Sequence, residues 1–68
     1  MTERGYYRFT VKDGARGHFW IAAEPAGVTI KSLDDCVRGF DLGPQASHGD
    51  AVAIADFLNQ NILAITLT

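Results

Sequence analysis

The chain has few of the residues that stabilise small proteins through covalent or metal cross-links. Its 68 residues include one cysteine, Cys36, two prolines and two histidines. A single cysteine forms no intramolecular disulfide, and no Cys/His cluster has the spacing of a zinc site. The sequence therefore predicts a cytoplasmic protein that needs no disulfide, metal or cofactor.

Positive charge and long apolar runs are also scarce. Six lysine and arginine residues stand against eight aspartate and glutamate residues, and the formal net charge is −2. Basic side chains provide most of the affinity for nucleic acids, so this balance argues against a nucleic-acid partner. No apolar run approaches the roughly 20 residues that cross a bilayer. Residues 1–4 also lack the pattern of a signal peptide. We expect neither a nucleic-acid nor a membrane partner.

The length of the chain favours one domain, residues 1–68, with a marginal core. A chain of this size buries only about 60% of the surface that its unfolded form exposes. Small domains compensate with disulfides, metals or oligomerisation. Since the first two are not expected here, the sequence favours self-association, as a homodimer or with another protein partner.

A β-hairpin is predicted near the start of the chain. Residues 6–12 and 18–24 alternate apolar with polar or aromatic positions, as half-buried strands do. The two glycines within residues 13–17 suit the turn between them. One face is expected to pack against a helix, and it carries Tyr7, Phe9, Val11, Phe19, Ile21 and Ala23. The other face is expected to be open, and it carries Tyr6, Arg8, Thr10, His18, Trp20, Ala22 and Glu24.

The middle of the chain gives weaker patterns. Pro25 ends the second strand, because proline cannot donate to the ladder. Residues 28–30 are either a short strand or a bridging segment. Residues 32–36 predict a loop or a single helical turn, and the alternation in residues 37–42 predicts a further strand of the sheet.

A capped helix and a final strand are predicted at the C-terminal end. Ser47 is suited to be the N-cap, with Asp50 reaching back as in a capping box. The apolar positions of the helix form one face, widened by Val52, Ala53 and Phe57. The helix is expected to end at residues 59–61, with Asn61 in a left-handed conformation. A strand over residues 62–68 follows. The predicted fold is α+β: a three- to four-stranded, mostly antiparallel sheet with one helix on one face, in the order β-β-(β)-β-α-β.

The open face of the hairpin is the predicted binding surface. Tyr6, Arg8, His18 and Trp20 combine rigid aromatic rings with an arginine, a composition typical of binding hot spots. Two alternatives stay open. Tyr6 and Trp20 form a cross-strand pair that only stabilises the hairpin, or the two faces are exchanged and Trp20 lies in the core.

No residue set predicts catalysis, and we expect a protein that is not an enzyme. His18 and His48 have no further ligand at metal-binding spacing. The carboxylates of Asp34 and Asp35 disfavour a thiolate at Cys36. Neither serine of the chain, Ser32 or Ser47, lies in a nucleophile elbow.

Three features of the sequence resemble the small HicB-type antitoxin domain. They are an aromatic strand, a second strand that ends at residues 23–25, and a Ser-led helix with alanines at 51 and 55. That resemblance implies binding to a partner toxin. The loop between Pro25 and Ser47 departs from the pattern, because it lacks a short glycine-cysteine turn. We transfer no functional residue from this family.

The sequence predicts an interaction module that self-associates through the strand 62–68 or through the open face. The alternative is a regulatory domain that binds an anionic metabolite or a peptide at Tyr6, Arg8, His18 and Trp20. The two differ in whether Trp20 stays exposed in a monomer.

Overall fold

The computed structural model describes residues 2–14, 18–33 and 39–68. Within these ranges the elements are β1 (Glu3–Gly5), β2 (Tyr7–Asp13), β3 (Phe19–Pro25), the 3-10 helix η2 (Lys31–Leu33), β4 (Gly39–Asp41), α1 (His48–Asn61) and β5 (Ile65–Leu67). The predictions that concern residues 15–17 and 34–38, including Cys36, lie outside the described residues.

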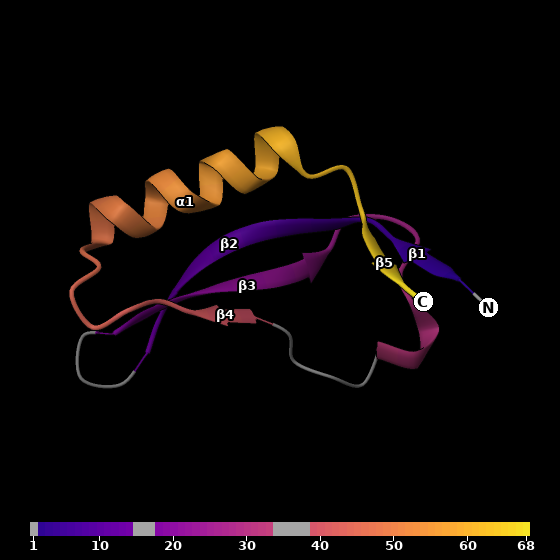
Figure 1. The fold of residues 1–68 in the computed structure, drawn as a ribbon, viewed down its shortest axis with the longest axis horizontal. Helices are drawn as coiled ribbons and strands as arrows, with labels where there is room; N and C mark the ends of the chain where they lie inside the picture. The colour runs from indigo at the N-terminus through magenta and orange to yellow at the C-terminus, as the bar shows by residue number, and fades with distance from the viewer. Residues whose placement is uncertain (1, 15–17, 34–38) are drawn as a thin grey trace.

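The main sheet is antiparallel and has β3 between β2 and β4. In Figure 1, α1 lies along β2, and it packs against β2 and β3. Lys12 of β2 lies opposite Trp20 of β3, and Ile21 of β3 lies opposite Phe40 of β4. This arrangement confirms the predicted α+β class, with one helix on an antiparallel sheet.

The core lies between α1 and the face of the hairpin that the alternation predicted. Its buried residues are Tyr7, Phe9, Ile21, Ala23, Ile30 and Ala55, with Val11, Leu33, Leu42, Leu58 and Ile65 packed around them. Neighbouring residues of a strand point to opposite faces, so Trp20, beside the fully buried Ile21, lies on the face away from the helix. The alternative that placed Trp20 in the core is wrong.

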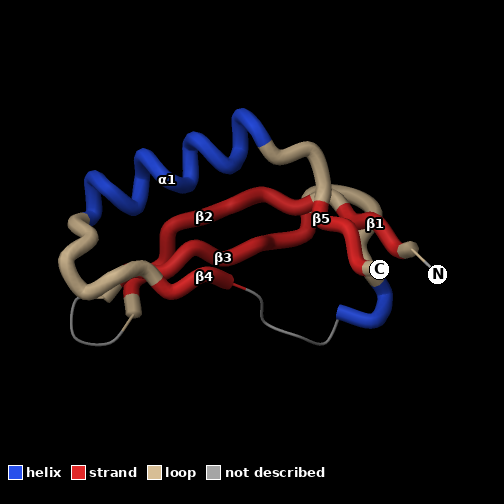
Figure 2. The backbone as a smooth tube through the Cα atoms, in the orientation of Figure 1, coloured by secondary structure: helices blue, strands red, loops and turns tan. Residues whose placement is uncertain are grey.

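The final strand differs from the prediction. It is limited to Ile65–Leu67, and it pairs antiparallel with β1 in a separate two-stranded sheet. Figure 2 shows this pair beside the ends of the chain, away from β4. β1 was not predicted, because the sequence Glu3–Arg4–Gly5 has no apolar alternation. The position of the short strand β5 is therefore set by its pairing with β1, at the other end of the chain.

Residues 28–30 form a bridging segment and not a strand. The backbone N–H of Tyr6 donates to the carbonyl of Val28 at 2.7 Å. The N–H of Ile30 donates to the Tyr7 hydroxyl at 3.0 Å, and the Ile30 side chain is buried. A buried N–H needs an acceptor. The Tyr7 hydroxyl supplies one and so attaches the bridge to the core.

The predicted capping box at the start of α1 is confirmed. The Asp50 N–H donates to the Ser47 hydroxyl at 3.1 Å, and the Ser47 N–H donates to the Asp50 carboxylate at 3.0 Å. Together they satisfy donors that the first helical turn leaves without intrahelical partners.

α1 ends at Asn61, within the predicted residues 59–61, but the predicted left-handed conformation of Asn61 is wrong, because Asn61 is helical and the C-cap, Ile62, is extended. The Asn61 side chain donates to the carbonyl of Phe57 at 2.8 Å, and the Ile62 N–H donates to the carbonyl of Leu58 at 2.8 Å. These bonds satisfy carbonyls of the last turn, so no left-handed residue is needed there.

Asn59 joins α1 to the outer edge of β2. Its side-chain oxygen accepts from the Phe9 N–H at 2.8 Å, and its side-chain NH₂ donates to the Phe9 carbonyl at 2.9 Å. One amide thus provides the donor and the acceptor that a neighbouring strand would provide. The outer edge of β2 is closed at Phe9, and the helix is held over this side of the sheet.

Replacement of Asn59 by alanine is expected to lower the free energy of unfolding by about 1–3 kcal/mol, because both bonds to Phe9 are lost at a partly buried site. Urea denaturation measures this loss. Gln60→Ala is the matched control, because Gln60 is the exposed neighbour in the same helix. Its effect should stay within about 0.5 kcal/mol. Equal effects of the two variants would refute the structural role of Asn59.

Candidate functional site

The four predicted binding residues do not form one site. Trp20 lies opposite Lys12, whereas Tyr6 precedes β2 and its carbonyl accepts from the Ala26 N–H at 3.0 Å. At roughly 3.3 Å per residue, Tyr6 and Trp20 are about 20 Å apart along the sheet. The alternative of a Tyr6–Trp20 pair is therefore wrong. His18 lies near Trp20 at the other end of the hairpin, where its carbonyl accepts from the Gly14 N–H at 2.6 Å.

Glu24 organises the polar half of the open face. Its carboxylate accepts from the Thr10 hydroxyl at 2.6 Å and forms an ion pair with Lys12 at 3.2 Å. The hydrogen bond from Thr10, the contact with Lys12 and the charge of Arg8 hold the pKa of Glu24 below the ordinary 4.5. Arg8 lies directly opposite Glu24 in the register. The positive charge predicted to attract an anionic ligand thus faces a carboxylate of this chain.

Trp20 lies across the sheet towards β4. A Cβ atom built on Gly39 would be 2.5 Å from Cε3 of Trp20, and one built on Gly14 would be 3.5 Å from its Cδ1. The six-membered part of the indole therefore covers the backbone of Gly39, where a side chain would collide with it. Trp20 is half-buried in this way without a partner chain.

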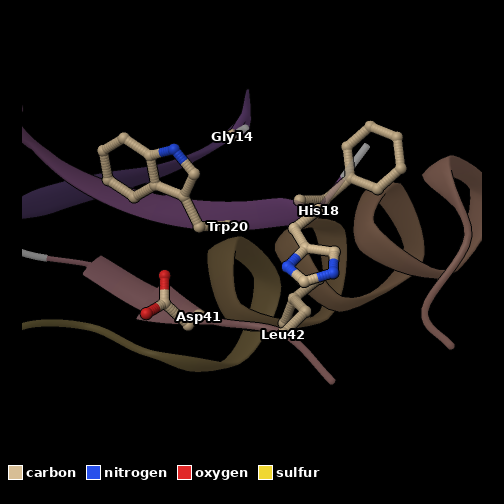
Figure 3. Close-up of a pocket in the computed structure, with 6 residues that line it drawn as sticks. Gly14, His18, Trp20, Asp41 and Leu42 are labelled. Carbon is tan, nitrogen blue, oxygen red and sulfur yellow. The ribbon is translucent and has the colours of Figure 1, made fainter. Parts of the chain in front are cut away.

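A small pocket of about 270 Å³ lies at this end of the sheet, and it is lined by Gly14, His18, Phe19, Trp20, Asp41 and Leu42. Figure 3 shows its labelled side chains, with the Asp41 carboxylate on the strand next to Trp20. Asp41 is opposite Trp20 in the register. An aromatic face beside a carboxylate favours a cation. The pocket therefore has the opposite charge preference to the anion site expected from the sequence.

Phe19 and His48 connect the pocket region to the start of α1. Their ring centroids are 5.4 Å apart, with the planes tilted by 58°. His48 thus has an aromatic neighbour, but among the described residues no three His, Cys, Asp or Glu side chains are placed to hold a metal ion. Within the same residues, no helix is long and apolar enough to cross a bilayer.

An exposed apolar surface was missed when the binding site was predicted. Phe40 of β4 is 55% exposed, Phe57 of α1 is 64% exposed, and Ile54 is also exposed. We call Phe40 and Ile54 the α1–β4 surface, because Phe57 lies about 160° around the helix axis from the buried Ala55 and projects away from the sheet. Phe40 lies on the helix side of the sheet, because it is opposite Ile21 and its ring centroid is 6.3 Å from that of Phe9.

Helical geometry places Ile54 on the flank of α1 that faces β4. Ala51 and Ala55 point to the core, and Asn59 reaches the outer edge of β2 on one flank. Five residues of an α-helix turn through about 500°, so Ile54 lies about 140° around the axis from Asn59. It therefore lies on the other side of the buried stripe. The apolar surface of the helix, wider than one stripe, was the signal in the sequence for this flank.

No protein-family model, no curated protein and no solved structure matches this chain. The resemblance to the HicB-type antitoxin domain thus rests on the sequence pattern alone.

The interactions of Glu24 predict an acid-dependent loss of stability. Its pKa is lowered in the folded state, so its stabilising contribution is complete above about 4.5 and is lost as the pH falls through the lowered value. Urea denaturation at neutral pH and at about pH 3 should show a smaller loss for Glu24→Gln than for the wild type.

Thr10→Val is the graded comparison, because it removes the first of these hydrogen bonds and keeps the charge of Glu24. It should weaken the pH dependence without abolishing it. Identical pH dependence in wild type and Glu24→Gln would show that the carboxylate does not stabilise the fold.

Proposed function

We propose that this protein is a non-enzymatic interaction module that self-associates through the α1–β4 surface. The observation that carries the proposal is a mismatch between core and surface. Among the described residues, only Ile21 and Ile30 are large side chains with complete burial, while Phe40 is more than half exposed and Ile54 is exposed as well. Contact between two copies is a direct way to bury them.

The energetics favour association through Phe40 and Ile54. Complete burial of a large apolar side chain stabilises by about 1.5–3 kcal/mol. A domain of this size has a net stability of only a few kcal/mol. Burial of Phe40 and Ile54 against a second copy is therefore a large term relative to the stability of one chain. Neither residue carries a charge, so their contact needs no ion pair and no acid–base chemistry.

Compartment and partner class belong to the same proposal. We place the protein in the cytoplasm, because its single cysteine suits a reducing compartment. A protein partner, and not nucleic acid or a membrane, fits the net charge of −2 and the apolar character of the proposed surface.

Light scattering over a concentration series should show a monomer–dimer equilibrium. Phe40→Ser should raise the dissociation constant at least tenfold, because the dimer loses two buried rings. Val28→Ser is the matched control: Val28 is 71% exposed but lies beyond β3, outside the α1–β4 surface. It should leave the constant unchanged. A wild-type protein that stays monomeric at every concentration would overturn the proposal.

The second candidate function is binding of a small cation, and the pocket beside Trp20 and Asp41 favours it. Trp20 is the only tryptophan, so its emission reports on this pocket. Nα-acetyl-lysine methylamide should quench the emission in the wild type and have little effect in Asp41→Asn. The norleucine analogue, which lacks the ammonium group, is the control ligand. Equal responses to both ligands would exclude a cation site.

A further inference from the structure

We propose that two copies associate by antiparallel pairing of β4 with β4, which joins their sheets into one. This inference rests on the proposed self-association and specifies its geometry. The two edges of the main sheet differ. β2 is closed at Phe9 by the Asn59 side chain, whereas no described segment pairs with the outer side of β4. Figure 1 shows β4 on the side of the sheet away from α1.

The backbone groups of β4 that point outwards follow from its pairing with β3. The Leu42 N–H donates to the carbonyl of Phe19 at 3.2 Å, so the backbone of Leu42 faces β3. Backbone direction alternates along an antiparallel strand, and Phe40 therefore also faces β3. Gly39 and Asp41 direct their N–H and C=O groups away from the sheet. Unpaired strand edges of this kind readily accept another strand.

The sequence of β4 fits a twofold register centred on Phe40. In that register each Phe40 lies opposite its symmetry mate, and Gly39 of one copy lies opposite Asp41 of the other. Each Gly39–Asp41 pair exchanges two backbone hydrogen bonds, so four form in total. Gly39 presents no side chain that could crowd the opposing Asp41. The two Asp41 residues lie diagonally, about 7–8 Å apart, where solvent weakens their repulsion.

A second copy fits this edge better than a foreign strand does, because it supplies a matching apolar surface. A twofold axis perpendicular to the sheet keeps both α1 helices on the same face, one on each side of the Phe40 pair. The flanks that carry Ile54 then face each other above the two Phe40 rings. A foreign strand would satisfy the backbone of β4 but would bring no second helix to cover these residues.

Asp41→Pro tests the pairing directly. Proline removes the outward N–H of Asp41, which serves no described bond within the chain, and its ring occupies the outer edge. We expect sedimentation equilibrium to show a dissociation constant at least 100-fold higher than that of the wild type. Asp41→Asn is the control. It keeps the N–H and removes the repulsion between the two carboxylates, so it should dimerise at least as tightly as the wild type.

A cross-link tests the register without relying on the fold of the proline variant. Directly opposed residues of a non-hydrogen-bonded pair have Cα atoms about 4.5 Å apart, within the range that a disulfide spans. Phe40→Cys in a Cys36→Ser background should form a disulfide-linked dimer on mild oxidation. Phe57→Cys in the same background should form far less, because α1 does not meet its own symmetry mate at that residue in this register.

The outcomes separate the two proposals. A dimeric wild type, a monomeric Asp41→Pro and an efficient Phe40→Cys cross-link support β4 pairing. A dimeric Asp41→Pro without the cross-link overturns the pairing and leaves self-association through another contact, such as the edge of β5. If Asp41→Pro is unfolded, the cross-link alone decides. A wild type that is monomeric at every concentration overturns both proposals.

Discussion

The bidentate contact between Asn59 and the backbone of Phe9 determines how the helix lies on the sheet. It joins residues 50 positions apart in the chain, at 2.8 and 2.9 Å. It holds α1 over β2, and the helix consequently covers β2 and β3 and leaves the helix side of β4 uncovered. One polar side chain therefore closes one edge of the sheet and leaves the other edge open.

The rest of the architecture follows from this offset. Ala51 and Ala55 allow the helix to approach the sheet closely above the hairpin. Phe40, on the uncovered strand, packs against Phe9 at the side of the core and is more than half exposed. On the opposite face of the sheet, Glu24 with its partners Thr10 and Lys12 covers one half. The Trp20 indole covers Gly39 in the other half. The helix side of β4 thus carries an exposed aromatic ring, that of Phe40.

Local patterns predicted the parts of the fold that depend on local physics. The alternation through Tyr7 and Phe9 identified the buried face of the hairpin, and the spacing of Ser47 and Asp50 identified the capping box. The β1–β5 pair was not predicted, because Glu3–Gly5 has no periodicity and its partner lies at the other end of the chain. Asn59 was interpreted as a helix stop, since its contact with Phe9 exists only in the tertiary fold.

The candidate site was harder to predict for a related reason. Alternation correctly placed Arg8 and Trp20 on one face, but it gives no distance along that face, and the register separates Tyr6 from Trp20. Nor does it reveal that Glu24 faces Arg8 or that Asp41 lies beside Trp20. The exposed state of Phe40 follows from the offset of the helix, which no pattern within β4 encodes.

Amide hydrogen exchange at several protein concentrations tests the central claim, that one edge of the sheet is closed within the chain and the other is closed by a second copy. The Phe9 amide should be protected at every concentration, because Asn59 is its partner. The Asp41 amide should exchange rapidly in dilute protein and become protected as the concentration rises. An Asp41 amide that exchanges rapidly even where the protein is fully dimeric would contradict the account.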